Sequence, residues 1–314
     1  MDLFWADDGR LRAGWRFLLS VLLFVFVNAF AGDIANSWAG PSDGKFELLF
    51  RPLFLILLLI VFSALLKIFD RVERNPLSAM GLGRNRLYHD AAIGFIAGAV
   101  MVGLAVLPIA IGFHLGFRLI LSRHSLKLAL AVVFILATGA MAEEVAFRGY
   151  PFQRLVEATG PFAAILLSSA LFGSLHLRNP HASVFGLINT VAIGIVLAVA
   201  YLRTKALWLP WGLHFGWNLT LGLLLGLPVS GIQQFAVVVR GTASGPVWLT
   251  GGAYGIEAGM AGTLAIAAGF IFVLLGVEHR PGTSLQGATE EKSLIGSDAG
   301  GIQVNQGRGP TGTG

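Results

Sequence analysis

The stretch LKLALAVVFILATGAMAEEVAFRGY, residues 126–150, determines the fold class. Its mostly apolar run has the length of a membrane helix, since about 20 residues cross the hydrocarbon core of a bilayer. Glu143, Glu144 and Arg148 lie close together at the end of the same run. A charge at the bilayer centre costs about 2.5–3.5 kcal/mol on insertion scales, so ionisable side chains inside a span are candidates for function.

The composition extends this interpretation to the whole chain. Of the 314 residues, 55% are hydrophobic and 12% are charged, whereas a soluble domain carries roughly 25% charged residues. The mean hydropathy of +0.74 predicts an integral membrane protein. The net charge of +5 fits basic cytoplasmic loops, so we expect no nucleic-acid partner. The absence of cysteine excludes disulfides, thiolate zinc sites and cysteine nucleophiles.

The apolar segments are predicted to be helices, because lipid satisfies no backbone hydrogen bond. The chain is therefore predicted to be an all-α polytopic membrane protein, a bundle of about eight transmembrane helices. The predicted spans cover residues 14–32, 50–68, 91–113, 126–147, 161–177, 184–202, 206–226 and 256–276. We expect one transmembrane helical domain over 1–277. The rest, 278–314, is rich in Gly, Ser and Thr and is predicted to be a disordered cytoplasmic tail.

The distribution of basic residues predicts the orientation in the membrane. About two thirds of the 22 Lys and Arg residues fall on the inner side if the N-terminus is cytoplasmic, so both termini are predicted to be cytoplasmic. The acidic residues before the first span favour an uncleaved helix over a signal peptide. The outer segment 227–255 is left open as a re-entrant or interfacial hairpin.

The two adjacent glutamates, Glu143 and Glu144, are predicted to have different roles. Glu144 and Arg148 are spaced i,i+4 with the acid first, the favourable order for an ion pair on a helix. Glu143 is rotated from Glu144 by about 100° and lacks that partner, which leaves its carboxylate available for chemistry. The alternative is that all three charges only mark the cytoplasmic end of the fourth span.

A second candidate, His176, lies near the end of the fifth predicted span. Gly160 and Pro161 mark a turn over 157–161 between the fourth and fifth spans. In an antiparallel hairpin, Glu143 and His176 would each stand about 24 Å from that turn, at about 1.5 Å per residue, and would meet at one level. A lone histidine in an apolar helix is otherwise more often a packing residue.

The third candidate pair, His214 and Asn218, shares one helix face at i,i+4 spacing. The alternative is an interfacial aromatic belt with a snorkelling histidine. General acid–base chemistry needs a carboxylate and an imidazole near one water, and acyl chemistry needs donors at the oxyanion. The three clusters together predict a hydrolase that acts inside the membrane. No His is followed by Glu as in the HExxH zinc motif, and Ser244 in a polar loop is judged a decoy.

The three motifs, in this order on successive apolar segments, resemble the CPBP family of CAAX-processing and bacteriocin-processing intramembrane proteases. The motifs are EExxxR (Glu143, Glu144, Arg148), FxxxH (Phe172, His176) and HxxxN (His214, Asn218). The resemblance covers about residues 125–225, the expected protease core, and looks like the bacterial branch, which implies a bacterial cell membrane. It implies that Glu143 polarises a water with help from His176. It further implies an oxyanion site of His214 and Asn218, supported by Glu144 and Arg148.

The resemblance leaves several alternatives open. It implies a membrane-associated peptide or protein as substrate. If a metal is used, Glu143, His176 and His214 would bind zinc; we favour a metal-free mechanism and expect no other cofactor. A proton-coupled secondary transporter and a non-catalytic membrane scaffold are the competing functions. The hairpin argument puts the site in the outer half of the membrane, whereas the resemblance implies a cavity reached from the cytoplasm.

Overall fold

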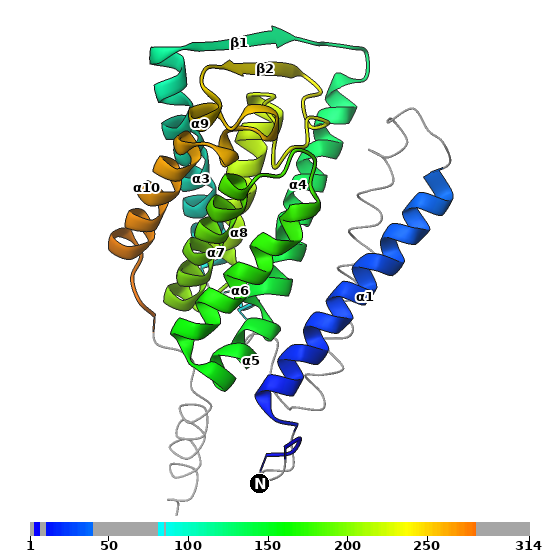
Figure 1. Cartoon of the computed structure of the whole chain (residues 1–314), viewed down its shortest axis with the longest axis vertical. Coiled ribbons are helices and arrows are strands. Elements are labelled where there is room, and N and C mark those ends of the chain that lie inside the picture. Colours follow the sequence, from blue (N-terminus) through cyan, green and yellow to red (C-terminus); the bar gives the residue numbers. More distant parts are fainter. Residues whose placement is uncertain (1–2, 7–10, 40–80, 85, 281–314) are drawn as a thin grey trace, which may run out of the picture. The chain divides into compact units, whose positions relative to one another are not determined.

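The computed structural model describes residues 3–6, 11–39, 81–84 and 86–280 (Figure 1). The predicted span 50–68 lies outside the described residues. The predicted tail also lies outside them, except for residues 278–280.

The described chain is 72% helical, which confirms the predicted all-α class. Helices run in the order α1 (Ala13–Ala39), α3 (Leu87–Gly112), α4 (Ser125–Arg148), α5 (Tyr150–Thr159), α6 (Pro161–Leu175), α7 (Val184–Thr204), α8 (Trp208–Leu219), α9 (Val247–Thr250) and α10 (Met260–Gly276). Four helical stretches are long and apolar enough to cross a membrane: Leu87–Gly112, Ser125–Thr159, Pro161–Arg178 and Val184–Thr204. The chain is therefore an integral membrane protein.

α4 agrees with the fourth predicted span, 126–147, but a second helix, α5, was not predicted between this span and the turn at Gly160. α4 ends at Arg148, and Gly149 leaves the helical conformation with φ −77° and ψ −137°. Pro151 at the start of α5 favours a new helix, because its fixed φ suits the first turn. The predicted turn is present at Gly160, whose φ of 81° suits glycine. The hairpin argument took residues 143–159 as one helix, whereas the structure divides them between α4 and α5.

α3 and α8 pack backbone against backbone through glycines spaced four apart. A Cβ atom on Gly94 would press on the carbonyl of Leu209, and one on Gly98 would press on the carbonyl of Leu213. Likewise, a Cβ atom on Gly212 or Gly216 of α8 would press on a backbone carbonyl of α3. Small residues at this spacing let membrane helices approach closely. This contact fixes α8, the helix that carries the predicted His214–Asn218 pair.

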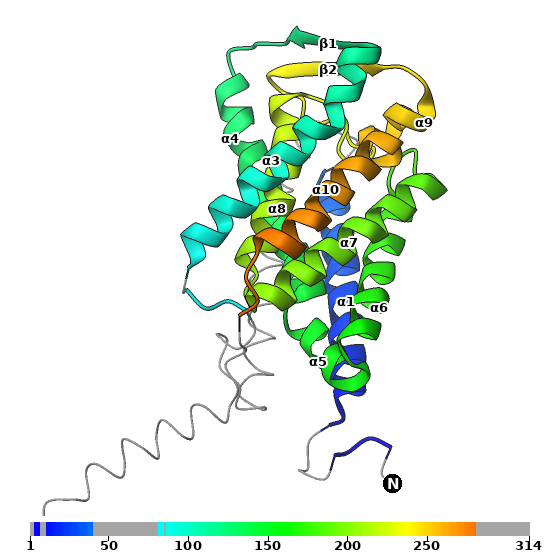
Figure 2. The ribbon, with the colours of Figure 1, turned by 90° about the vertical axis from the view of Figure 1, so that its left-hand side faces the viewer.

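A two-stranded ribbon at one end of the bundle was not predicted. β1 (His114–Leu119) follows α3 and pairs antiparallel with β2 (Val239–Ser244) (Figure 2). The segment 227–255 therefore supplies one strand to a partner far away in the sequence. Up to Gly259, its C-terminal part contains only the short helix α9 and two 3₁₀ turns. α10 therefore begins at Met260, four residues after the predicted start.

Candidate active site

One cavity of about 630 Å³ gathers all four predicted catalytic residues. Glu143 reaches it from α4, His176 from the 3₁₀ turn His176–Arg178 that follows α6, and His214 and Asn218 from α8. Segments around Asn189, Ser230 and Glu257 complete the lining. Ser244, judged a decoy, lies on β2 and is not among the lining residues. The lining is mostly apolar, so its few polar groups define what chemistry the cavity can support.

The expected ion pair of Glu144 and Arg148 is present and fully buried. The Arg148 Nη1 lies 3.3 Å from Glu144 Oε1, and both side chains have 0% exposure. Arg148 Nη2 also donates to the carbonyl of Gly194 on α7, at 3.2 Å. The guanidinium lies 4.4 Å above the ring of Phe172. A single arginine therefore ties α4 to α6 and α7 directly behind the cavity.

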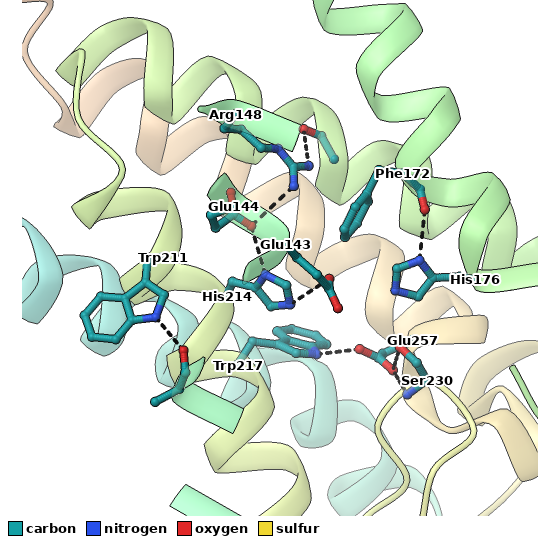
Figure 3. Close-up of polar contacts among 12 residues, drawn as sticks. Glu143, Glu144, Arg148, Phe172, His176, Trp211, His214, Trp217, Ser230 and Glu257 are labelled. Atoms are coloured by element: carbon teal, nitrogen blue, oxygen red, sulfur yellow. Dashed lines mark hydrogen bonds and ion pairs between the residues drawn. The ribbon is translucent and has the colours of Figure 1, made fainter. Parts of the chain in front are cut away.

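His214 lies between the two glutamates (Figure 3). Its Nδ1 is 2.9 Å from Glu144 Oε1, and its Nε2 is 3.8 Å from Glu143 Oε2. A carboxylate only accepts, so Nδ1 carries the hydrogen and donates to Glu144. The other nitrogen is thereby directed at the cavity. Glu144 accepts from both Arg148 and His214, which makes it the acceptor that orients the imidazole.

His176 is oriented by its own helix. Its Nδ1 lies 2.9 Å from the carbonyl oxygen of Phe172, one turn earlier. Because a carbonyl only accepts, Nδ1 donates and Nε2 remains available to the cavity. The Phe172 ring packs against both imidazoles, with ring centroids 4.8 Å from His176 and 6.3 Å from His214. The phenylalanine of the FxxxH motif thus positions both histidines and Arg148.

α8 is held in place by its tryptophans. Trp211 Nε1 donates to the carbonyl of Ala137 on α4 at 2.9 Å. Trp217, adjacent to Asn218, donates to Glu257 at 2.8 Å. Asn218 itself lines the cavity one turn beyond His214, as the i,i+4 spacing predicts. The aromatic residues that suggested an interfacial belt are therefore packing and hydrogen-bonding residues of the bundle.

Glu257 is a cavity residue that the motif analysis missed. It lies on the 3₁₀ turn Ile256–Ala258, just before α10, and its carboxylate accepts from Trp217 and from the backbone and hydroxyl of Ser230. A signal for it existed, because Glu257 is the ionisable residue inside the predicted span 256–276. The argument from intramembrane charge that selected Glu143 applies equally to it.

The donor set proposed for zinc does not form a metal site as it is arranged here. Among residues 86–280 and the shorter described segments, no three His, Asp or Glu side chains are grouped closely enough to hold a metal ion. In this arrangement His176 does not join Glu143 and His214 as a third ligand. A three-ligand zinc site needs all three donors at about 2.0–2.2 Å from one point.

Comparison with known proteins locates the similarity in the same region. Residues 125–220 match the family model of type II CAAX prenyl endopeptidase Rce1-like proteins. The chain is also 35% identical over 89 residues to the "Putative membrane peptidase YdiL" of Bacillus subtilis (strain 168), a match that spans 28% of this chain and 34% of the relative. The chain thus covers about a third of that relative's length. No solved structure matches the chain. Residues 125–220 are therefore similar to the Rce1-like, or CPBP, family that the three motifs indicate.

Proposed function

We propose that this protein is an intramembrane endopeptidase that hydrolyses a peptide bond of a membrane-associated protein or peptide. The observation that carries the proposal is the grouping of one carboxylate, two imidazoles and one amide, from three separate elements, around a single cavity. The names of the matching family and relative, an endopeptidase and a membrane peptidase, agree with this class of reaction. A bacterial cell membrane with both termini in the cytoplasm remains the proposed location.

Glu143 is the proposed general base. Its side chain is 38% exposed, in contrast to the fully buried Glu144, so it can contact a water in the cavity. It takes a proton from that water, whose oxygen bonds to the carbonyl carbon of the substrate. The peptide C–N bond then breaks, and the proton is delivered to the departing amine. His176, with Nε2 facing the cavity, orients the water and shares in this proton transfer.

His214 and Asn218 are the proposed oxyanion donors. The 3.8 Å separation between His214 Nε2 and Glu143 Oε2 exceeds a direct hydrogen bond, which leaves room for a reacting group between them. A protonated Nε2 and the Asn218 amide would donate to the oxygen that becomes negative in the transition state. Such preorganised donors contribute about 10²–10³-fold in rate each. Glu144 and Arg148 act indirectly, because they hold His214 in the required orientation.

The test is cleavage of a membrane-associated reporter peptide by purified protein in detergent, with products identified by mass spectrometry. Glu143→Gln keeps the size of the side chain and removes the base, so we expect a rate loss of about 10²–10⁴-fold with unchanged thermal stability. His176→Ala should also lose activity. Glu157→Gln is the matched control, because Glu157 pairs with Arg16 and Arg154 rather than facing the cavity. Cleavage of the peptide by Glu143→Gln at the wild-type rate would refute the proposal. Transport of a solute by the wild type without any hydrolysis would instead favour the alternative function, a proton-coupled secondary transporter.

A further inference from the structure

Glu257 has no role in the hydrolysis proposed above, yet its carboxylate faces the same cavity (Figure 3). It comes from a segment between β2 and α10, apart from the motif-bearing helices. Three neutral donors hold it: the Trp217 indole at 2.8 Å, the Ser230 hydroxyl at 3.1 Å, and the Ser230 backbone N–H. Its two oxygens are therefore fixed in position within the cavity wall.

The charge of Glu257 lacks a cationic partner of the kind that Asp90 and Glu144 have. Asp90 receives both Arg280 nitrogens at 2.6 and 2.9 Å, and Glu144 pairs with Arg148. Within the part of the chain that the structure describes, no lysine or arginine forms an ion pair with Glu257. Neutral donors satisfy a carboxylate's hydrogen bonds without compensating its charge.

The environment of Glu257 disfavours the uncompensated charge. Burial raises the pKa of this carboxyl, although the hydrogen bonds from Ser230 and Trp217 and the proximity of His176 act in the opposite direction. A cation that entered the cavity beside Glu257 would offset the desolvation of the carboxylate. The open side of the carboxylate is the cavity, so the missing cation can come from a bound molecule.

We propose that Glu257 is a subsite for a cationic group of the peptide substrate, in the same cavity as Glu143, His176 and His214. The class of group is an ammonium or guanidinium, from a Lys or Arg side chain near the scissile bond or from a free N-terminus. This inference rests on the proposed peptidase function and specifies its substrate. It also explains why a carboxylate occupies the position, since a purely structural clamp between Trp217 and Ser230 needs acceptors but no charge.

The experiment measures both binding and cleavage of a peptide series. One apolar, membrane-associated peptide is made with a single Lys moved along its length, with norleucine in place of that Lys, and with the N-terminus free or acetylated. Binding is measured on Glu143→Gln protein by fluorescence anisotropy, so that its outcome does not depend on turnover. We expect one Lys position, or the free N-terminus, to bind about tenfold or more tightly than the neutral peptide.

Glu257→Gln on the same background should remove that preference and leave the binding of the norleucine peptide within about twofold. Glu157→Gln, the same chemical change outside the cavity, should keep the preference. If no peptide is cleaved by the wild type but the Glu257-dependent preference in binding is present, the hydrolase proposal fails and the cationic subsite stands. Two results would overturn the proposed cationic subsite. One is equal binding of the charged and neutral peptides by Glu143→Gln protein that retains Glu257. The other is an unchanged preference for the charged peptide in a folded Glu257→Gln variant.

Discussion

Replacing Arg148 with methionine should strongly destabilise the bundle. Methionine keeps most of the volume and removes the charge, so Glu144 would be left as a buried carboxylate without its cation. Removing one partner of a buried ion pair costs about 3–5 kcal/mol. The lost hydrogen bond to the Gly194 carbonyl and the lost contact with the Phe172 ring act in the same direction. We therefore expect a loss near the upper part of that range.

The assay is reversible unfolding in detergent, followed by circular dichroism, for Arg148→Met and for the double variant Glu144→Gln/Arg148→Met. The glutamine keeps an acceptor for the His214 Nδ1–H and carries no charge. The double variant should therefore lie within about 1–2 kcal/mol of the wild type, because replacing a whole buried ion pair with neutral groups is often close to neutral. The resulting coupling energy between the two positions would be about 2 kcal/mol or more.

Two results would refute this reasoning. One is an Arg148→Met variant with wild-type stability, which would mean that the buried Glu144 carboxylate does not need the Arg148 cation to offset its desolvation. The other is a double variant as unstable as Arg148→Met alone, which would place the loss in packing rather than in the unpaired carboxylate. Arg148→Lys offers a further check, since it keeps the charge but cannot reproduce the planar contacts with Glu144, the Gly194 carbonyl and Phe172 together.

Three further predictions concern the elements that position the cavity. Gly98→Val should destabilise the protein by about 1–3 kcal/mol in the same unfolding assay and should reduce cleavage, because the valine side chain would displace α8. Gly103→Val is the control: it lies on the same helix with open space around it, so it should change neither stability nor cleavage. Because burial raises the pKa of Glu257 above the usual 4.5, the stability that comes with its protonation is present at low pH and is lost as pH rises through the folded-state pKa. Glu257→Gln should flatten this part of the stability profile. Asn189→Ala should cost about 1–3 kcal/mol, measured by denaturant midpoint, because Asn189 donates to the backbone carbonyls of Glu257 and Gly259 at 2.8 and 3.1 Å.

The sequence predicts the helices and the candidate site well where a single physical rule applies. Apolar length placed α3, α4, α6 and α7 to within a few residues, because a membrane helix must satisfy its own backbone and bury few charges. The i,i+4 rule predicted that Glu144 would pair with Arg148 and that His214 and Asn218 would face the same cavity. These are local relations that need no knowledge of neighbouring helices.

What the sequence did not predict depends on contacts between distant segments. The pairing of β1 with β2 joins residues on either side of five helices, and no local pattern specifies such a partner. The separate helix α5 was missed, because the hairpin argument carried the fourth helix on to Thr159. The hydrogen bond from His214 to Glu144 follows from the rotation of α8 against α4, which helix periodicity alone does not determine. Glu257 was missed although the rule for intramembrane charge includes it.

The two adjacent glutamates of the EExxxR motif have different environments because one imidazole contacts both. Glu143 and Glu144 differ in direction by about 100° around α4, and the opposite nitrogens of His214 face them at 3.8 and 2.9 Å. The rotation of α8 about its axis therefore helps to determine that Glu144 is hydrogen-bonded to His214 while Glu143 remains available to a water molecule. That rotation is set on the far side of α8 by the glycine contacts with α3. A substitution at Gly94 or Gly98, on a helix that bears none of the motifs, should change the chemistry of Glu143 through His214.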